Sequence, residues 1–485
     1  MLNMAAIIEK INKDGQSLMS SVLSDLIHDH RPQHDHMLAN YKRYKASKDP
    51  DGVPVFNRHI EQDTKVDRKL NDAFDADVVD VKTGYMMGNP VIYALDKSDY
   101  TNDAGVFDKA KYDLDFKVVK EFNARNGAED IDGETLKMAS ICGYSARLLW
   151  NNVAGTASIM NVPPWEAIFV RDGSLNEAQY AMRYYELDIH DKKYTYVEWY
   201  DALNISYYIS SDSIDKQGPK DTIVFKPYDK PVELHMFKDI PLIQFVNNEE
   251  LQGDCDKVYA LIDAYDFTSS DVSSEIEQFR LAYMFFAGMA PDAKVRDEAK
   301  KTGIYGLPDE TTKVGFITKD MNDDAIEHHL ERLEKNIYRF AKSVNFSDEA
   351  FAGNISGIAM KFKMFGLESK CIISERKFTA ALRTQYMVLS TYWKVKQSSI
   401  DYMKITYTWT RNFPLNLLDE AETTAKLKGL VSEETRLGLL SFIDDPLKEI
   451  EKMERENAGI VDLDEPELDI DGNPIEPAGM PNSEA

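Results

Sequence analysis

Two apolar seams with a heptad period most constrain what this chain of 485 residues can fold into. In each seam apolar side chains recur at alternating steps of four and three, the spacing of two long helices that pack together. They predict an antiparallel helical hairpin with a small tip domain, although an ordinary bundle core would show the same stripe. The first seam comprises Val258, Ile262, Tyr265, Ser269, Val272, Ile276, Phe279, Tyr283 and Phe286, and the second Ile326, Leu330, Leu333, Ile337, Phe340 and Val344.

The chain before the hairpin combines helical and extended patterns. A helix is predicted from Ile7 to Leu26, with Pro32 opening a second short helix, and a further helix from Ile131 through Leu148. Residues 163–246 alternate apolar and polar side chains around a DG turn, which predicts a mostly antiparallel sheet. The predicted fold class is therefore α+β.

Residues 358–396 predict one long helix, with Gly366 as its kink. Residues 361–396 contain eight Lys and Arg but only two Glu, so this is the most basic element of the chain. A solvated helix face and a phosphate-facing surface both explain that balance, and both remain open. A half-buried strand around Met403–Thr410 follows, and then three helices, at 415–428, after Ser432 and from Pro446.

Charge and cysteine content exclude several classes of protein. The formal net charge of −26 argues against a protein that grips nucleic acid, because phosphate binding needs clustered Lys and Arg. Eight acidic and no basic residues follow Ile460, which predicts a disordered tail. Three distant cysteines predict neither a disulfide framework nor a zinc site. The N-terminal residues do not resemble a secretory signal, and the longest apolar run, Leu281–Ala290, is about half of a membrane span.

Motifs for catalysis and metal binding were sought and do not occur. The strings GxxxxGK[ST], GxSxG and HExxH are absent, so the chain is predicted to be neither a DNA motor nor another enzyme, and to need no cofactor. Four histidines, His28, His30, His34 and His36, lie together at 28–36. We interpret them as a solvated helix junction, with a metal site as the alternative.

Four stretches in the same order as in a known family carry a resemblance across most of the chain. The sequence resembles the portal proteins of tailed bacteriophages, in the group typified by long-tailed phages of Gram-positive hosts. The stretches are DVKTGYMMGNPV at 80–91, IPLIQFVNNEELQGDCDKVYALIDAYDFTSSD at 240–271, FAGNISGIAMKFKMFGLESK at 351–370 and WTRNFPLNLLDEAETTAKLKGLVSEETRLGLLSFIDDPLKEIEKMERE at 409–456.

The resemblance implies the portal fold, with the helical hairpin as the stem of a ring that is typically dodecameric. It implies these segments: a wing at 1–255, stem helix 1 at 256–289, a clip at 290–321, stem helix 2 at 322–345, a tunnel loop at 346–358, a long kinked helix with a return strand of the wing at 359–412, a helical crown at 413–458 and an acidic tail at 459–485.

The implied function is a channel for genome packaging and ejection at one capsid vertex of the virion, assembled in the host bacterial cytoplasm. The implied partners are further copies of the chain, double-stranded DNA, the terminase large subunit, a head–tail adaptor, and scaffolding and major capsid proteins, with no membrane. A head-associated minor structural protein or nuclease is the alternative. The expected DNA-channel residues are Ser347, Asp348, Glu349, Asn354, Ser356, Lys361 and Lys363.

Overall fold

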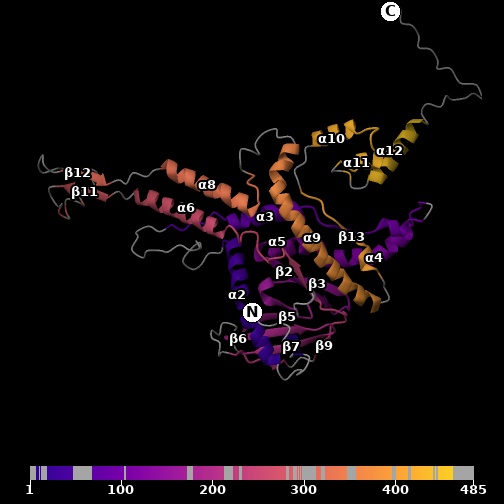
Figure 1. Cartoon of the computed structure of the whole chain (residues 1–485), viewed down its shortest axis with the longest axis horizontal. Helices are drawn as coiled ribbons and strands as arrows, with labels where there is room; N and C mark the ends of the chain where they lie inside the picture. Colours follow the sequence, from indigo (N-terminus) through magenta and orange to yellow (C-terminus); the bar gives the residue numbers. More distant parts are fainter. Residues whose placement is uncertain are drawn as a thin grey trace, which may run out of the picture. The chain divides into compact units, whose positions relative to one another are not determined.

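The computed structural model divides the chain into two compact units, Met1–Asp348 with Lys363–Asn412, and Glu349–Phe362 with Phe413–Ala485 (Figure 1). The structure describes residues 7–9, 11, 19–46, 68–102, 105–171, 178–211, 222–228, 232–279, 283–287, 292, 294, 297, 313–317, 323–346, 357–395, 400–412, 417–440, 443 and 446–461.

The largest sheet of the first unit is antiparallel and has the order β4-β5-β6-β7-β8, with β9 also paired to β7. This confirms the antiparallel sheet predicted from the alternation over 163–246. A two-residue turn, His190 and Asp191, joins β5 to β6 with φ of 51° and 60°, the positive values of a tight hairpin turn. The strands are β4 (Ala167–Val170), β5 (Tyr180–Ile189), β6 (Lys192–Tyr200), β7 (Asn204–Ser210), β8 (Lys226–Pro227) and β9 (Glu233–Leu234).

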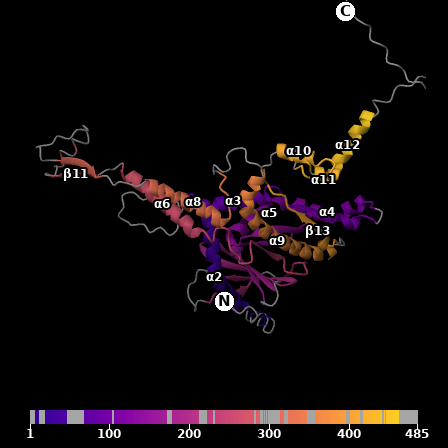
Figure 2. The ribbon, with the colours of Figure 1, turned by 45° about the horizontal axis from the view of Figure 1, so that its top comes forward.

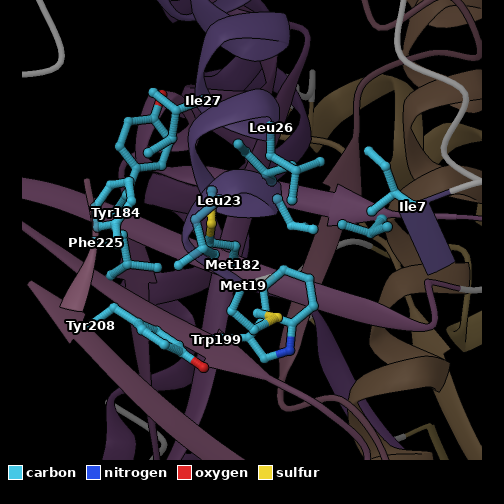
Figure 3. Close-up of a cluster of buried hydrophobic side chains, with 14 of the residues drawn as sticks. Ile7, Met19, Leu23, Leu26, Ile27, Met182, Tyr184, Trp199, Tyr208 and Phe225 are labelled. Carbon is cyan, nitrogen blue, oxygen red and sulfur yellow. The ribbon is translucent and has the colours of Figure 1, made fainter. Parts of the chain in front are cut away.

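Helix α2 (Met19–Tyr44) covers one face of this sheet. Figure 3 shows Leu23 and Leu26 directed at Met182 and Trp199 of the strands, and all four are buried. The prediction that Pro32 opens a second helix is wrong, because Pro32 lies inside α2. Residues on both sides of Pro32, including Leu26 and Met37, are buried, and this packing holds the helix continuous despite the lost backbone hydrogen bond.

A three-stranded sheet with the order β10-β2-β3 lies next in the unit, and its apolar side chains share a core with the larger sheet. The preceding helix ends at Cys142, so the prediction that it runs through Leu148 is wrong. Gly143 has a φ of 89°, which favours glycine, and a Cβ there would collide with the carbonyl of Leu251. The strands are β2 (Tyr144–Asn151), β3 (Ala157–Val162) and β10 (Leu242–Val246).

A two-stranded ribbon, β1 (Ile92–Leu95) with β13 (Ile405–Thr408), joins parts of the chain far apart in sequence. The second of these strands confirms the one predicted around Met403–Thr410. The other elements of this part are α3 (Phe74–Met87), α4 (Lys109–Asn126), α5 (Ala128–Cys142) and the short 3-10 helices η2 (Lys97–Tyr100), η3 (Pro164–Glu166) and η5 (Tyr402–Lys404).

Helices α6 (Tyr259–Phe279) and α8 (Asp323–Ala341) form the predicted antiparallel hairpin (Figures 1 and 2). The prediction that the first helix reaches residue 289 is wrong, because β11 (Tyr283–Ala287) pairs antiparallel with β12 (Lys313–Ile317). The aromatic sequence at 283–286 is compatible with a strand as well as with a helix, since a short apolar run does not discriminate between the two. The strand predicted at Val314–Thr318 is confirmed as β12.

Among the seam residues whose burial the structure describes, those at the base of the hairpin are the most deeply buried. Ile262 of α6 and Ile337 of α8 are fully buried, in a core shared with Phe74 and Val78 of α3. Farther along α6 from this core, Ile276 is 55% exposed, and beside the core Phe340 of α8 is 54% exposed. The base of the seam therefore joins the hairpin to α3.

Helix α9 (Gly357–Val395) confirms the long helix predicted at 358–396, while its kink at Gly366 stays a prediction. In the second unit the described elements after it are α10 (Leu417–Lys426), α11 (Glu433–Leu437) and α12 (Pro446–Val461). The Ser432 side chain caps α11 by accepting from the Thr435 N–H, as predicted. Among the helices of the described residues, none is long and apolar enough to span a membrane.

Candidate functional site

Five of the seven expected channel residues lie outside the described residues: Ser347, Asp348, Glu349, Asn354 and Ser356. The other two, Lys361 and Lys363, lie exposed on α9. Residues two positions apart on an α-helix are rotated by about 200° around its axis, so these two lysines project to different sides of α9. The structure therefore does not bring Lys361 and Lys363 together at one point.

Lys370 of α9 connects the helix that follows the segment 346–358 with the residues that precede this segment. Its Nζ donates to the carbonyl of Ala341, the last residue of α8, at 2.8 Å. The same Nζ lies 3.6 Å from Oδ1 of Asp254, shortly before α6 begins. One side chain thus joins the start of α6 and the end of α8 to α9.

Asp254 is also the partner of a second, fully buried lysine on α3. Lys82 Nζ lies 3.1 Å from Asp254 Oδ2 and donates to Asn247 Oδ1 at 2.6 Å. Ser374 of α9 donates to the same Asn247 oxygen at 3.0 Å. We call these five residues, Lys82, Asn247, Asp254, Lys370 and Ser374, the lysine–aspartate cluster.

Burial and the neighbouring charges shift the pKa values of this cluster in opposite directions. Burial lowers the pKa of Lys82, because it removes water from the charged form, and Asp254 opposes that effect. Although burial alone would raise it, the pKa of Asp254 is held below its usual value by Lys370 and Lys82. One carboxylate balances two ammonium groups, so removing it would leave buried positive charge.

A second buried cluster fixes the hairpin to α2. Arg43 Nε lies 3.1 Å from Asp75 Oδ1 of α3, and its Nη1 lies 2.8 Å from Asp263 Oδ1 of α6. The guanidinium also stacks on the Tyr259 ring, 4.2 Å from its centroid. Nearby, burial raises the pKa of Asp266 to about 7. The base of the hairpin is therefore held by charged groups from three helices.

A second buried arginine fixes the middle of α9 to the three-stranded sheet. Arg147 of β2 lies 2.8 Å from Asp132 Oδ1 of α5, and its Nη1 donates to Gln385 Oε1 of α9 at 3.0 Å. Arg147 and Asp132 are almost completely buried. Such pairs position elements, because each charge is satisfied only in one arrangement of the helices.

The histidines at 28–36 occupy α2 and not a helix junction, so that interpretation is wrong. His30 is buried and hydrogen-bonds through Nδ1 to the Tyr184 hydroxyl at 2.8 Å. His34 contacts Asp35, and His36 contacts Asp256. Among the residues that the structure describes, no group of three or more His, Cys, Asp and Glu side chains could hold a metal ion.

Sequence reasoning missed the lysine–aspartate cluster, although α3 carried a signal for it. The buried face of α3 is apolar at Val78, Val79 and Met86 and is interrupted by Asp75 and Lys82. A charged side chain on an apolar helix face predicts a buried partner. The pattern does not identify that partner, because Asp254 lies 172 residues away.

The sequence matches known proteins over nearly its whole length. The profile of a family described as "Phage portal protein, SPP1 Gp6-like" matches residues 23–462. The portal protein of Bacillus phage SPP1 is 24% identical over 487 residues, which cover 93% of this chain and 89% of the relative. The portal protein of Clostridium phage phiCD119 is 26% identical over 427 residues, covering 83% and 87% respectively.

These matches define first a class, the structural proteins of the phage virion. More narrowly, the chain belongs to the SPP1 Gp6-like family of phage portal proteins. It is thus a component of the portal at the capsid vertex, where the DNA-packaging channel lies, and it is a structural protein and not an enzyme. The predicted family, α+β fold class, portal role and location at the capsid vertex of the virion are confirmed.

Proposed function

We propose that twelve copies of this chain form the portal ring, with α6 and α8 as its stem and the segment at 290–321 as its clip. Residues 1–255 form the wing in this arrangement, and 413–458 form the crown. The observation that carries the proposal is the lysine–aspartate cluster, which ties both ends of the hairpin to α9. Force on the stem would therefore reach α9 and the segment 346–358 directly.

We assign the contact with DNA to the tunnel loop and the start of α9. Its residues are Ser347, Asp348, Glu349, Asn354, Ser356, Lys361 and Lys363. A chain with a net charge of −26 repels phosphates, so a channel built from it would let DNA slide without sticking. The exposed Lys361 and Lys363 supply short-lived contacts within this repulsive channel.

The clip is the proposed docking site for the terminase large subunit during packaging and later for the head–tail adaptor. Scaffolding and major capsid proteins would contact the wing. Membership of the portal family supports these proposed partners. Within the proposed clip the structure describes residues 292, 294, 297 and 313–317, and β12 in this part pairs with β11, which precedes the clip.

Replacing Asp348 and Glu349 together by Lys tests the DNA assignment. We expect slower or stalled packaging in a reconstituted reaction of procapsids, terminase and ATP, because the added charge would hold phosphates in the channel. A matched control carries the same charge change at two exposed positions of the proposed wing, Asp188→Lys and Glu250→Lys. Packaging rate and packaged DNA length equal to those of the control would contradict the assignment.

A further inference from the structure

We propose that the exposed face of α9 inserts into a groove on a second copy of this chain, formed by β1, α4 and the first turn of α5. The contact would join neighbouring subunits, so the inference rests on the proposed ring. It goes further by naming the two surfaces that meet and the residues on each.

The exposed face of α9 is apolar near its N-terminal end. Phe362 is 77% exposed, Phe365 70%, Ile373 48% and Ile372 37%. These positions share one side of the helix, whereas Met364, Leu367 and Cys371 on the opposite side are buried. Two phenylalanines exposed to this degree beside each other mark an interaction surface.

Cations extend this face toward the C-terminal end of α9. Arg376 and Arg383 follow Phe365 and Ile372 on the same side, and both are exposed. A surface that fits this face must therefore offer an apolar floor and carboxylates at its margin. The strong negative charge of the chain makes a second copy a suitable source of those carboxylates.

A groove with this chemistry lies between β1, α4 and α5. It encloses about 1010 Å³ and is lined by the apolar side chains of Ile92, Tyr112 and Phe116. Ile92 is 56% exposed, so the floor is open to solvent. The volume is at the upper end of the roughly 300–1,000 Å³ of typical ligand pockets, enough for more than one aromatic ring.

The margin of the groove is acidic. Asp113, Glu129 and Asp130 line it together with Lys117 and Lys120. Lys117 lies 3.8 Å from Glu121, which offsets its charge. The groove margin therefore has a net negative charge, which favours a cationic partner such as the α9 face that carries Arg376 and Arg383.

The two surfaces belong to different parts of one chain, so their contact is head-to-tail. Contacts of that kind generate closed rings when the rotation between copies closes. Within the first unit, Lys370 of α9 bonds to Ala341 at the end of α8, whereas α9 meets α4 farther along the helix, where the Tyr386 hydroxyl donates to Asn123 Oδ1. One chain would thus leave its own groove open for its neighbour.

Cysteine crosslinking of the full chain tests this pairing. The variant with Phe365→Cys and Ile92→Cys should give a ladder of covalent multimers with a short bis-maleimide, while each single variant stays at monomer size on a denaturing gel. The native cysteines Cys142, Cys255 and Cys371 are buried and should not react. The matched control pairs Phe365→Cys with Val153→Cys, a fully exposed position in the β2–β3 turn.

A charge exchange tests the margin of the contact without crosslinking. Arg376→Glu should raise the protein concentration at which half of the chains are in rings by roughly tenfold or more. Adding Asp130→Lys to that variant should restore most of the loss. Circular dichroism on each variant separates an assembly defect from a folding defect.

A ladder in the Phe365–Ile92 variant together with rescue by Asp130→Lys supports the pairing. Rings that form at the wild-type concentration in Arg376→Glu, with no ladder beyond that of the Val153 control, would overturn it and leave the portal ring intact. A wild-type chain that stays monomeric would overturn the ring itself, and this inference with it.

Discussion

The six-stranded sheet and the base of the α6–α8 hairpin are both tightly buried, but they are stabilised by different groups. The sheet packs Leu23 and Leu26 of α2 on Met182 and Trp199, an apolar core. The hairpin base instead joins helices through buried charges, Lys82 with Asp254 and Arg43 with Asp263. Apolar contacts tolerate small shifts, whereas a buried ion pair is satisfied in one geometry. The six-stranded sheet thus depends mainly on apolar burial for its stability, whereas the buried charges hold the hairpin base in a fixed position.

Removing the shared carboxylate should have the largest effect. Asp254→Ala leaves Lys82 buried without its anion, so we expect the free energy of unfolding to fall by about 3–5 kcal/mol. Urea unfolding of the variant and the wild type at one fixed protein concentration measures this difference in the free energy of unfolding. A loss as small as that of an exposed ion pair would show that the hairpin base does not depend on its buried charges.

An apolar truncation in the sheet should cost slightly less and should not depend on pH. Leu23→Ala removes a fully buried side chain and should lower the free energy of unfolding by about 2–5 kcal/mol through lost burial and a cavity. The same urea experiment at pH 6 and pH 8 checks this. A loss that differs between these pH values would contradict a purely apolar core.

One buried titratable group makes the sheet itself sensitive to acid. Burial lowers the pKa of His30 from 6.5 to about 4, so the folded chain keeps it neutral where the unfolded chain is protonated. Stability should therefore be complete above pH 6.5 and decrease by about 2–3 kcal/mol as the pH falls toward 4. Comparison with the His30→Gln variant isolates the contribution of this residue. If the free energy of unfolding depended on pH identically in both proteins, His30 would not be the cause of the acid sensitivity.

The smallest effect is expected for an exposed ion pair on the same helix as Lys370. Glu249→Ala removes the partner of Lys377, and Glu249 is 80% exposed, so solvent screens the interaction. Its unfolding curve should overlap that of the wild type, which makes it the control for Asp254→Ala. A clear loss of stability would remove the contrast between buried and exposed pairs.

Local elements of this fold were predictable from the sequence, and their long-range partners were not. Period and turn residues predicted α6, α8, α9 and the strands of the six-stranded sheet, since each depends on nearby residues. They failed where a short apolar run fits two structures, as at Tyr283 and Phe286. They also failed at Pro32, where packing on both sides keeps α2 continuous.

The channel residues were predicted from a resemblance, whereas the lysine–aspartate cluster was not predicted at all. Lys82, Asp254 and Lys370 meet from three distant stretches, and no local spacing connects them. Two of the predicted channel residues, Lys361 and Lys363, are exposed on α9 as a DNA contact requires, but they project to different sides. Their joint contact with DNA would need different subunits or different points along the channel.

Electron microscopy of the purified full chain tests the central claim, that this protein is the subunit of a portal ring. We expect rings with a central hole, with one subunit number in the class averages and twelve as the expected value. A monodisperse monomer that cleaves DNA in the presence of a divalent metal would contradict it.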